Sequence, residues 1–247
     1  MELNYPQKSN GMFIISRDDM DDIANQVLRN EIPSVAEFAK EVDIVYLAKE
    51  CLFLDILSKC LSPDKSTLGL IAFEDDSISC YDLRYNQKTL DILGGTIVVD
   101  ISLSGQVNLP RRRFTIAHEV AHWILHRTYH SPTNQKFALK TVSCDSKNIE
   151  NIIFIPDSDL RLIRTDPEWE EWQADGLAAA LLMPSIPFQR LAIDKISYYY
   201  GGNMKQINIQ LDPYIYGNII RDISNVFNVS FAATEIRLKR FGFASIA

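Results

Sequence analysis

Residues 113–126 constrain this chain more than any other stretch, because they hold three of its four histidines and one H-E-x-x-H motif. Pro110 suits the first turn of a helix, apolar residues recur after it at helical spacing, and no Gly or Pro interrupts before Pro132. On such a helix His118 and His122 lie four residues apart and project from one face. Two imidazoles on one face can bind a single metal ion.

Glu119 follows the first of these histidines directly and points about 100° round the helix from it. Its carboxylate would therefore lie beside the metal, where it can polarise a water molecule and act as a general base. The alternative is a buried helix whose histidines are satisfied by hydrogen bonds. Two histidines and a glutamate on an otherwise apolar helix would then carry an avoidable desolvation cost, so we favour the metal site.

The composition describes a globular chain of 247 residues, 47% hydrophobic, with a net charge of −7. This length is enough for one sizeable core, or for a core domain with a smaller appendage. The acidic balance argues against nucleic-acid or anionic-membrane binding by the chain as a whole. The first ten residues lack the pattern of a secretory signal, and no apolar run approaches the ~20 residues of a spanning helix. We therefore expect a cytoplasmic protein without a membrane segment.

The four cysteines form no C-x-x-C pair, which suits reduced thiols in the cytoplasm. Cys144 is the closest of them in sequence to the H-E-x-x-H motif. We interpret it as an ordinary thiol in a polar loop rather than as a metal ligand.

Periodicity and turn residues predict an α+β fold that begins with helices. Residues 18–30 predict a first helix that ends before Pro33, Ser34 with Glu37 makes a capping-box pattern for a second, and Asp43 caps a third that reaches Leu54. Three short segments rich in β-formers then predict a small mixed or antiparallel sheet: residues 68–73, 77–81 and 96–99. An extended peptide could add to a strand edge beside the metal, and a covered edge is the equal alternative.

The second half of the chain is predicted to be mainly helical after a polar stretch. Residues 130–167 predict loops with one strand at 152–155, and residues 168–183 predict a strong helix stopped by Pro184. The remaining predicted elements are a helix at 188–196, a loop or linker at 198–203, and two helices at 216–227 and 230–241.

Two histidines rarely hold a catalytic zinc alone, and three protein ligands with an open fourth position are usual. The motif with three histidines has its third histidine at the position that Thr128 occupies here, so this pattern is excluded. His126 lies about two helical turns from His118, too far along the helix to bind the same metal. The best candidate is Glu171. Asp175 follows it four residues later on the same helix face, where it can accept a hydrogen bond from the far nitrogen of a ligand histidine.

Glu168 and Glu170 are the rivals of Glu171 for the third ligand position. Glu170 points about 100° away from Glu171, and Glu168 lies a turn earlier without an equally placed partner. The helix dipole favours acidic residues in a first turn, which explains both as exposed residues. Two histidines and one carboxylate predict one Zn²⁺ per chain, although manganese or iron would accept the same ligands.

Three further side chains follow the motif and could bend back toward it as oxyanion donors or substrate contacts: His126, Tyr129 and His130. For His126, an imidazole on the helix surface or in the core is the alternative. Residues 111–113 are all arginine, and we expect a solvated turn in which Arg113 pairs with a carboxylate.

Three segments of this sequence resemble the ImmA/IrrE family of metallopeptidases: RFTIAHEVAH at 113–122, EWQAD at 171–175 and AALLMP at 179–184. The resemblance extends over most of the chain, more weakly at its ends. It implies a zincin-like zinc peptidase of the cytosol with Glu171 as third ligand, acting on a helix-turn-helix transcriptional repressor in mobile-element or stress regulation. The long, tyrosine-rich stretch after Pro184 departs from the family pattern.

We accordingly divide the chain into two parts. Residues 1–200 would form the zincin-like domain, with a helical N-terminal part at 1–66 and the sheet and active-site helices at 67–190. Residues 201–247 would form a helical, helix-turn-helix-like element.

Two other functions compete with hydrolysis of a peptide bond. One is a regulatory repressor- or DNA-binding protein with a structural metal, which the C-terminal helix pair favours. Its charge over residues 221–240 is only +2, so we expect weak nucleic-acid binding or none. The other is a hydrolase of a non-peptide amide. The sequence predicts no oligomeric state.

Overall fold

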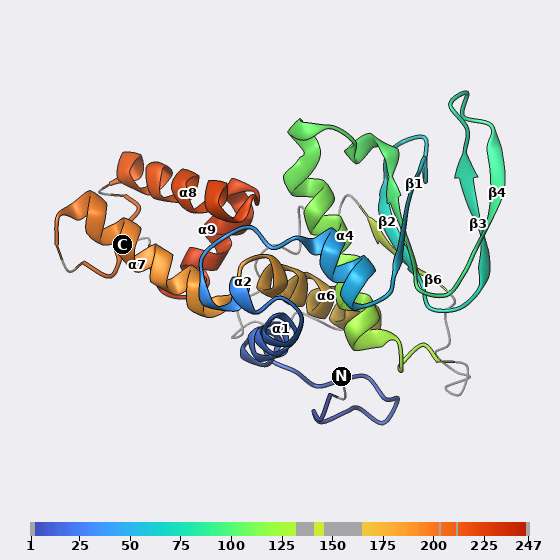
Figure 1. Cartoon of the computed structure of the whole chain (residues 1–247), viewed down its shortest axis with the longest axis horizontal. Coiled ribbons are helices and arrows are strands. Elements are labelled where there is room, and N and C mark those ends of the chain that lie inside the picture. The colour runs from blue at the N-terminus through green and yellow to red at the C-terminus, as the bar shows by residue number, and fades with distance from the viewer. Residues whose placement is uncertain (1–2, 132–140, 146–164, 203, 211, 246–247) are drawn as a thin grey trace.

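The computed structural model describes residues 3–131, 141–145, 165–202, 204–210 and 212–245, and these form a mixed α+β fold (Figure 1). The N-terminal half contains α1 Arg17–Glu31, α2 Pro33–Glu37, α3 Ile44–Tyr46, η1 Leu47–Cys51, β1 Asp55–Lys59, β2 Thr67–Ala72, β3 Asp76–Tyr81, β4 Gln87–Ile92, β5 Thr96–Asp100, η2 Ile101–Leu103, η3 Gln106–Asn108 and α4 Leu109–His126. The rest contains β6 Thr141–Asp145, α6 Asp166–Leu182, α7 Ser185–Tyr200, β7 Ile207–Asn208, α8 Pro213–Phe227, α9 Phe231–Arg240 and β8 Ala244–Ser245.

The N-terminal helices begin at residues that satisfy their free N–H groups. The Asp43 side chain accepts a hydrogen bond from the backbone N–H of Tyr46, which confirms the predicted cap of α3. The predicted capping box at Ser34 is wrong, because α2 begins at Pro33 and Ser34 lies inside it. Proline has a fixed φ that suits the first position of a helix, so Pro33 starts the element that it was expected to precede.

The central sheet has the strand order β1-β5-β2-β6 and is mixed, as predicted. β1 runs parallel to β5, whereas β2 runs antiparallel to both β5 and β6. The third helix ends at Cys51 rather than at Leu54, and β1 follows at Asp55, where no element was predicted. β6 lies in the stretch predicted to be loops, and the predicted strand at 152–155 falls outside the described residues. The two missed strands of this sheet are polar edge strands without a clear hydrophobic alternation. β4, β7 and β8, which lie outside this sheet, were not predicted either.

The two faces of the sheet have different covers. Helix α4 packs against one face, where it contacts β2, β5 and β6. The β3–β4 hairpin covers the other face through a small apolar cluster: Leu61, Leu70, Ala72, Ile78, Ile92 and Val98. The sheet therefore presents α4 to the interior of the molecule.

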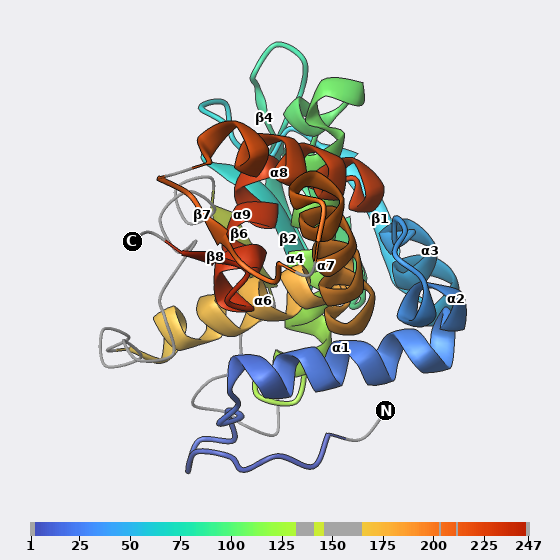
Figure 2. The same cartoon turned by 90° about the vertical axis from the view of Figure 1, so that its left-hand side faces the viewer.

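Helix α6 lies against α4 on the side away from the sheet, and α1 lies against α6 (Figure 2). Gly176 makes the second contact close, because a Cβ atom there would lie 2.3 Å from the Sδ atom of Met20 in α1. The main hydrophobic core continues from Phe13 to Ala244 and includes side chains of α7, α8 and α9. Among the described helices none is long and apolar enough by itself to cross a membrane, and only α6 with α7 passes that test as a pair, bent by 62°.

Two of the three C-terminal helices are longer than predicted, α7 and α8, whereas α9 has nearly the predicted bounds. Helix α7 continues through Tyr200, so the predicted loop at 198–203 is wrong at its start. The hydroxyls of Tyr199 and Tyr200 donate to Asp222 and Asp212, which gives these tyrosines partners within the helical packing. Gly201 then ends the helix with a φ of 68°.

Two buried arginines join distant parts of the chain. Arg113 of α4 pairs with Glu41 and donates to the carbonyls of Val42 and Asn228. The predicted partner carboxylate is thus confirmed, but Arg113 is buried rather than part of a solvated turn. Arg237 of α9 pairs with Asp21 of α1 and donates to the carbonyl of Met183.

Replacing Arg237 by Met should lower the free energy of unfolding by about 3 kcal/mol, because it leaves a buried carbonyl and a buried carboxylate with fewer partners. Urea denaturation monitored by circular dichroism would measure the change. Lys239→Ala is the matched control, since it breaks only a half-exposed pair with Glu235 and should cost less than about 0.5 kcal/mol. Equal losses in the two variants would contradict the joining role of Arg237.

Candidate metal centre

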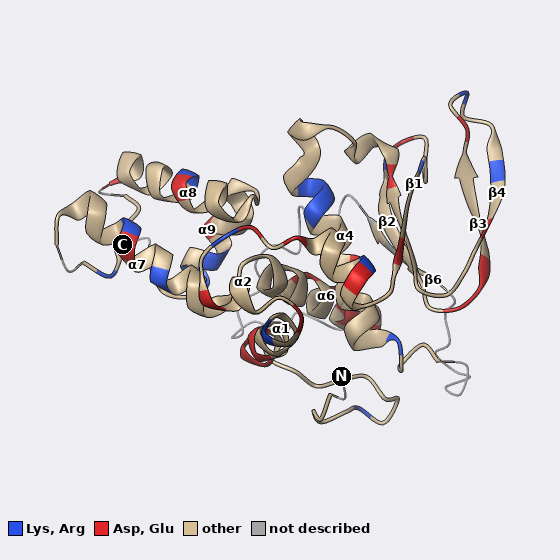
Figure 3. Cartoon of the chain, in the orientation of Figure 1, with Lys and Arg blue, Asp and Glu red and all other residues tan. Residues whose placement is uncertain are grey.

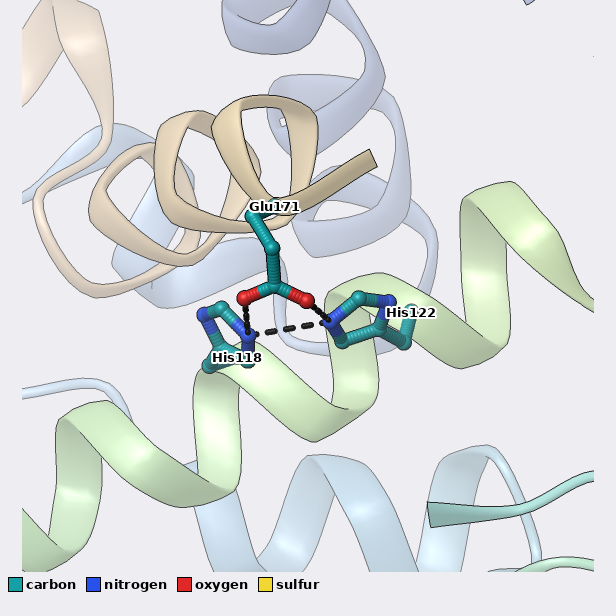
Figure 4. A group of neighbouring side chains, drawn as sticks. All are labelled: His118, His122 and Glu171. Atoms are coloured by element: carbon teal, nitrogen blue, oxygen red, sulfur yellow. Dashed lines mark hydrogen bonds and ion pairs between the residues drawn. The ribbon is translucent and has the colours of Figure 1, made fainter. Parts of the chain in front are cut away.

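The three predicted metal ligands converge between α4 and α6 (Figure 4). The Nε2 atoms of His118 and His122 lie 2.9 Å apart. Each lies 3.4 Å from one carboxylate oxygen of Glu171. Both histidines are completely buried and the Glu171 side chain is 14% exposed, so the three ligand atoms meet in a nearly dry interior.

The two 3.4 Å separations fit a tetrahedral metal ion, and the 2.9 Å separation of the two nitrogens is shorter than such an ion requires. Ligands bonded to zinc at about 2.0–2.1 Å lie about 3.3 Å from one another in a tetrahedron. The Nδ1 atom of His118 lies 2.9 Å from Asp175, whose carboxylate accepts the Nδ1 hydrogen and leaves Nε2 bare. Asp175 thus takes the place beside a ligand histidine that the sequence predicted. The donor set and the carboxylate separations suit Zn²⁺.

Electrostatics at the site favour positive charge. Burial lowers the pKa of His122, but Glu170 and Glu171 outweigh it and raise that pKa to about 9. Burial raises the pKa of Glu171, but its contacts with His118 and His122 lower it well below the ordinary value. The raised pKa keeps His122 protonated, and the lowered pKa keeps Glu171 ionised. Without metal, the histidines therefore hold protons where a cation would bind.

Glu119 projects from α4 toward the sheet beside these ligands. Its side chain is completely buried, and neither carboxylate oxygen has a hydrogen-bond partner within the part of the chain that the structure describes. Burial raises the pKa of this carboxyl to about 7. A buried carboxylate with two unused oxygens is costly unless a bound group uses them, so it fits a water molecule beside a metal.

Gly69 of β2, which is not among the residues predicted for the site, makes room for that carboxylate. A Cβ atom at Gly69 would lie 2.7 Å from Oε1 of Glu119 and 2.6 Å from Cγ2 of Thr115. A glycine inside a strand pattern often marks such a close approach, and this was the available signal.

Glu170 corrects the interpretation of the first turn of α6. It was explained as exposed, but it is buried, and its Oε1 lies 2.6 Å from His130 Nε2 and 3.5 Å from His122 Nδ1. Glu168 is exposed as expected and accepts a hydrogen bond from the N–H of Thr165. Packing of α6 against the end of α4 buries one of these two acids and leaves the other in solvent.

The three residues proposed as oxyanion donors lie elsewhere. His126 is buried on the Nδ1 side of His122, opposite the side that faces Glu171. Burial lowers its pKa to about 4, so it is neutral. His130 contacts Glu170, and the buried Tyr129 ring packs on His130. The structure does not bring these side chains to the ligand atoms.

A second group of possible ligands, His122, His126 and Glu170, shares His122 with the first. It would use the Nδ1 atom of that ring. A neutral imidazole whose Nε2 binds a metal keeps its hydrogen on Nδ1, so one ring cannot serve both groups without losing a second proton. The geometry therefore favours one metal ion per chain.

Cys144 lies in β6, not in a polar loop as interpreted from the sequence. It is fully buried and pairs in register with Gly69, so its side chain shares the sheet face that contacts α4. Burial raises the pKa of this thiol, which keeps it protonated. It is not a member of either ligand group.

No protein-family model matches this chain, and no curated protein matches it. Among solved structures, a Mycobacterium tuberculosis transcriptional regulator is similar over 93% of this chain, with 13% sequence identity and a TM-score of 0.42. The chain spans 57% of that protein's length. A likeness at this level supports no conclusion about fold or function.

Zinc titration of the metal-free protein should reach one ion per chain. His122→Ala and Glu171→Ala should each weaken binding by at least about 100-fold, because each removes one of three ligands. Competition with a chromophoric chelator would measure the dissociation constants. Glu168→Ala is the control from the same helix, and comparable weakening in that variant would contradict the ligand assignment.

Gly69→Ala should lower the free energy of unfolding by about 1–3 kcal/mol, because the added methyl group overpacks the space between β2 and α4. Thermal unfolding in matched buffers would measure it. Adding Thr115→Ser should restore part of the loss, since it removes one of the two atoms that the methyl group meets. A neutral effect of Gly69→Ala would show that the strand does not restrict Glu119.

Proposed function

We propose that this chain is a zinc-dependent endopeptidase with a zincin-like fold and a cytoplasmic protein as its substrate. The unpartnered, buried carboxylate of Glu119 beside the converged ligands is the observation that carries this proposal. Among the described residues no fourth side chain joins His118, His122 and Glu171, which supports an open position as in catalytic rather than structural zinc sites.

The roles of the side chains follow from their positions. A zinc ion held by the three ligands would supply a Lewis acid that polarises the scissile carbonyl and makes water more acidic. Glu119 takes a proton from the attacking water onto its carboxylate and then passes it to the leaving amine. Its raised pKa suits both steps near neutral pH. Asp175 holds the His118 ring with Nε2 toward the ligand position.

A helix-turn-helix repressor is the substrate class that we propose, because of the resemblance to the ImmA/IrrE family. β6 supports a peptide substrate. It is the outermost described strand on its side of the sheet, and it contacts the ligand helix α4. An extended peptide could pair with such a strand beside Glu119.

The competing proposal is a regulatory DNA- or repressor-binding protein with a structural metal. α8 and α9 flank a short turn, as in a helix-turn-helix. However, the basic side chains of α9 have acidic partners within the chain: Arg237 and Arg240 pair with Asp21, and Lys239 pairs with Glu235. Figure 3 shows acidic residues interspersed with basic ones on these helices. Fewer cations remain for phosphates, so packing is the better explanation of this element.

Glu119→Gln should keep zinc and lose at least about 100-fold of the cleavage rate, because the amide cannot accept the proton. The zinc-loaded wild type and variant would each be incubated with purified helix-turn-helix repressors from the same organism. Mass spectrometry of the fragments would give the rates and the cleaved bond.

Cleavage by Glu119→Gln at the wild-type rate would overturn the mechanism. If neither form cleaves any repressor, but the full chain binds random duplex DNA in a salt-dependent manner, the regulatory alternative holds instead.

A further inference from the structure

A chain of hydrogen bonds begins at the backbone carbonyl of Phe13, far from the metal site in sequence. This carbonyl accepts from Nε2 of Gln173 at 2.7 Å and from Nε1 of Trp169 at 3.2 Å. A backbone carbonyl can only accept, so the amide nitrogen of Gln173 must face it. The amide oxygen of the buried Gln173 side chain is thereby directed the other way, toward α4.

That oxygen determines the hydrogen positions of the next ring. Oε1 of Gln173 lies 3.0 Å from Nε2 of His126, and an amide oxygen can only accept, so Nε2 of His126 carries a hydrogen. His126 is completely buried, where a neutral ring is favoured over a charged one. The Nδ1 atom of the neutral ring is then bare.

The hydrogen position on His126 in turn determines the hydrogen position on His122, the predicted metal ligand. Nδ1 of His126 lies 3.0 Å from Nδ1 of His122, so the bare nitrogen accepts the hydrogen that His122 carries on Nδ1. Glu170, 3.5 Å from the same His122 atom, favours a hydrogen there as well. The Nε2 atom of His122 is left bare and faces His118 and Glu171.

We propose that Gln173 and His126 are positioning residues that fix the metal-binding tautomer of His122, with the Phe13 carbonyl as the fixed start of the relay. The inference rests on the metal site of the proposed function but concerns neither the substrate nor the cleavage step. The two ligand histidines are held differently: His118 by the Asp175 carboxylate, and His122 by the relay from the N-terminal segment together with the Glu170 carboxylate. Gln173 and Phe13 are 160 positions apart, so this relay couples the N-terminal segment to the site.

The tautomers can be observed directly, because the chain has only four histidines. Long-range proton–nitrogen correlation spectra of ¹⁵N-histidine-labelled protein, with and without zinc, distinguish the two hydrogen positions on each ring. We expect hydrogen on Nε2 of His126 and on Nδ1 of His122 in both forms. Gln173→Met should shift His126 toward a mixture of tautomers. A wild-type His126 with its hydrogen on Nδ1 would overturn the relay.

Measurements of zinc affinity distinguish the effect of the hydrogen-bond acceptor on His126 from the effect of the shape of its ring. His126→Phe keeps the shape and removes the acceptor, whereas His126→Asn keeps an acceptor oxygen near the Nδ1 position and loses half of the ring. We expect the dissociation constant for zinc to rise about 10-fold or more in His126→Phe, the range typical of lost outer partners, and to be largely restored in His126→Asn. Thr234→Val in α9 is the control for loss of a buried polar group elsewhere.

The outcomes distinguish this inference from the proposed function. Zinc binding by the wild type with equal affinities in the Phe and Asn variants would overturn the relay and leave the peptidase proposal standing. Failure of the wild type to bind zinc would overturn the peptidase proposal, while the spectra of the metal-free chain would still decide the relay.

Discussion

The apposition of α4 and α6 is the contact on which the rest of this structure depends. Three ligand atoms meet only because the two helices pack closely, and buried small residues on the ligand faces permit that approach: Ala121 on α4, and Ala174 and Ala178 on α6. Ala121 follows His118 by three residues, and Ala174 and Ala178 follow Glu171 by three and seven residues, so they share the same helix faces. A larger side chain at any of them would move a ligand as well as the core.

The surrounding elements hold this helix pair from three sides. β2 passes close to α4 at Gly69, α1 passes close to α6 at Gly176, and Arg113 ties α4 to the segment before α3 and to the turn after α8. Two of these contacts are close because glycine has no side chain, and the third is made by a buried arginine with several acceptors. Such contacts tolerate little displacement, because close-packed interiors have no spare volume. These contacts therefore leave α4 and α6 little room to shift relative to their neighbours.

The sequence alone predicted the elements whose residues recur at helical or strand spacing. The H-E-x-x-H helix and the positions of Glu171 and Asp175 on one face of α6 followed from helical spacing, and β2, β3 and β5 followed from their β-formers. β1 and β6 did not, because both are polar edge strands recognisable only by their partners. Glu170 was set aside for pointing about 100° away from Glu171. That angle places it on the other side of the His122 ring, where the packing of α6 buries it.

The buried polar groups of the site also bear on stability. Glu119 has two carboxylate oxygens without partners among the described residues, and the Nε2 atoms of His118 and His122 face one another at 2.9 Å. Two bare nitrogens at that distance would repel, so without metal a proton lies between them, and the unpartnered buried carboxylate costs free energy. A cation bound by both nitrogens would replace that proton, and a water molecule beside it would give Glu119 a partner. Such an ion would link metal binding to folding, because it would relieve the interior that holds it.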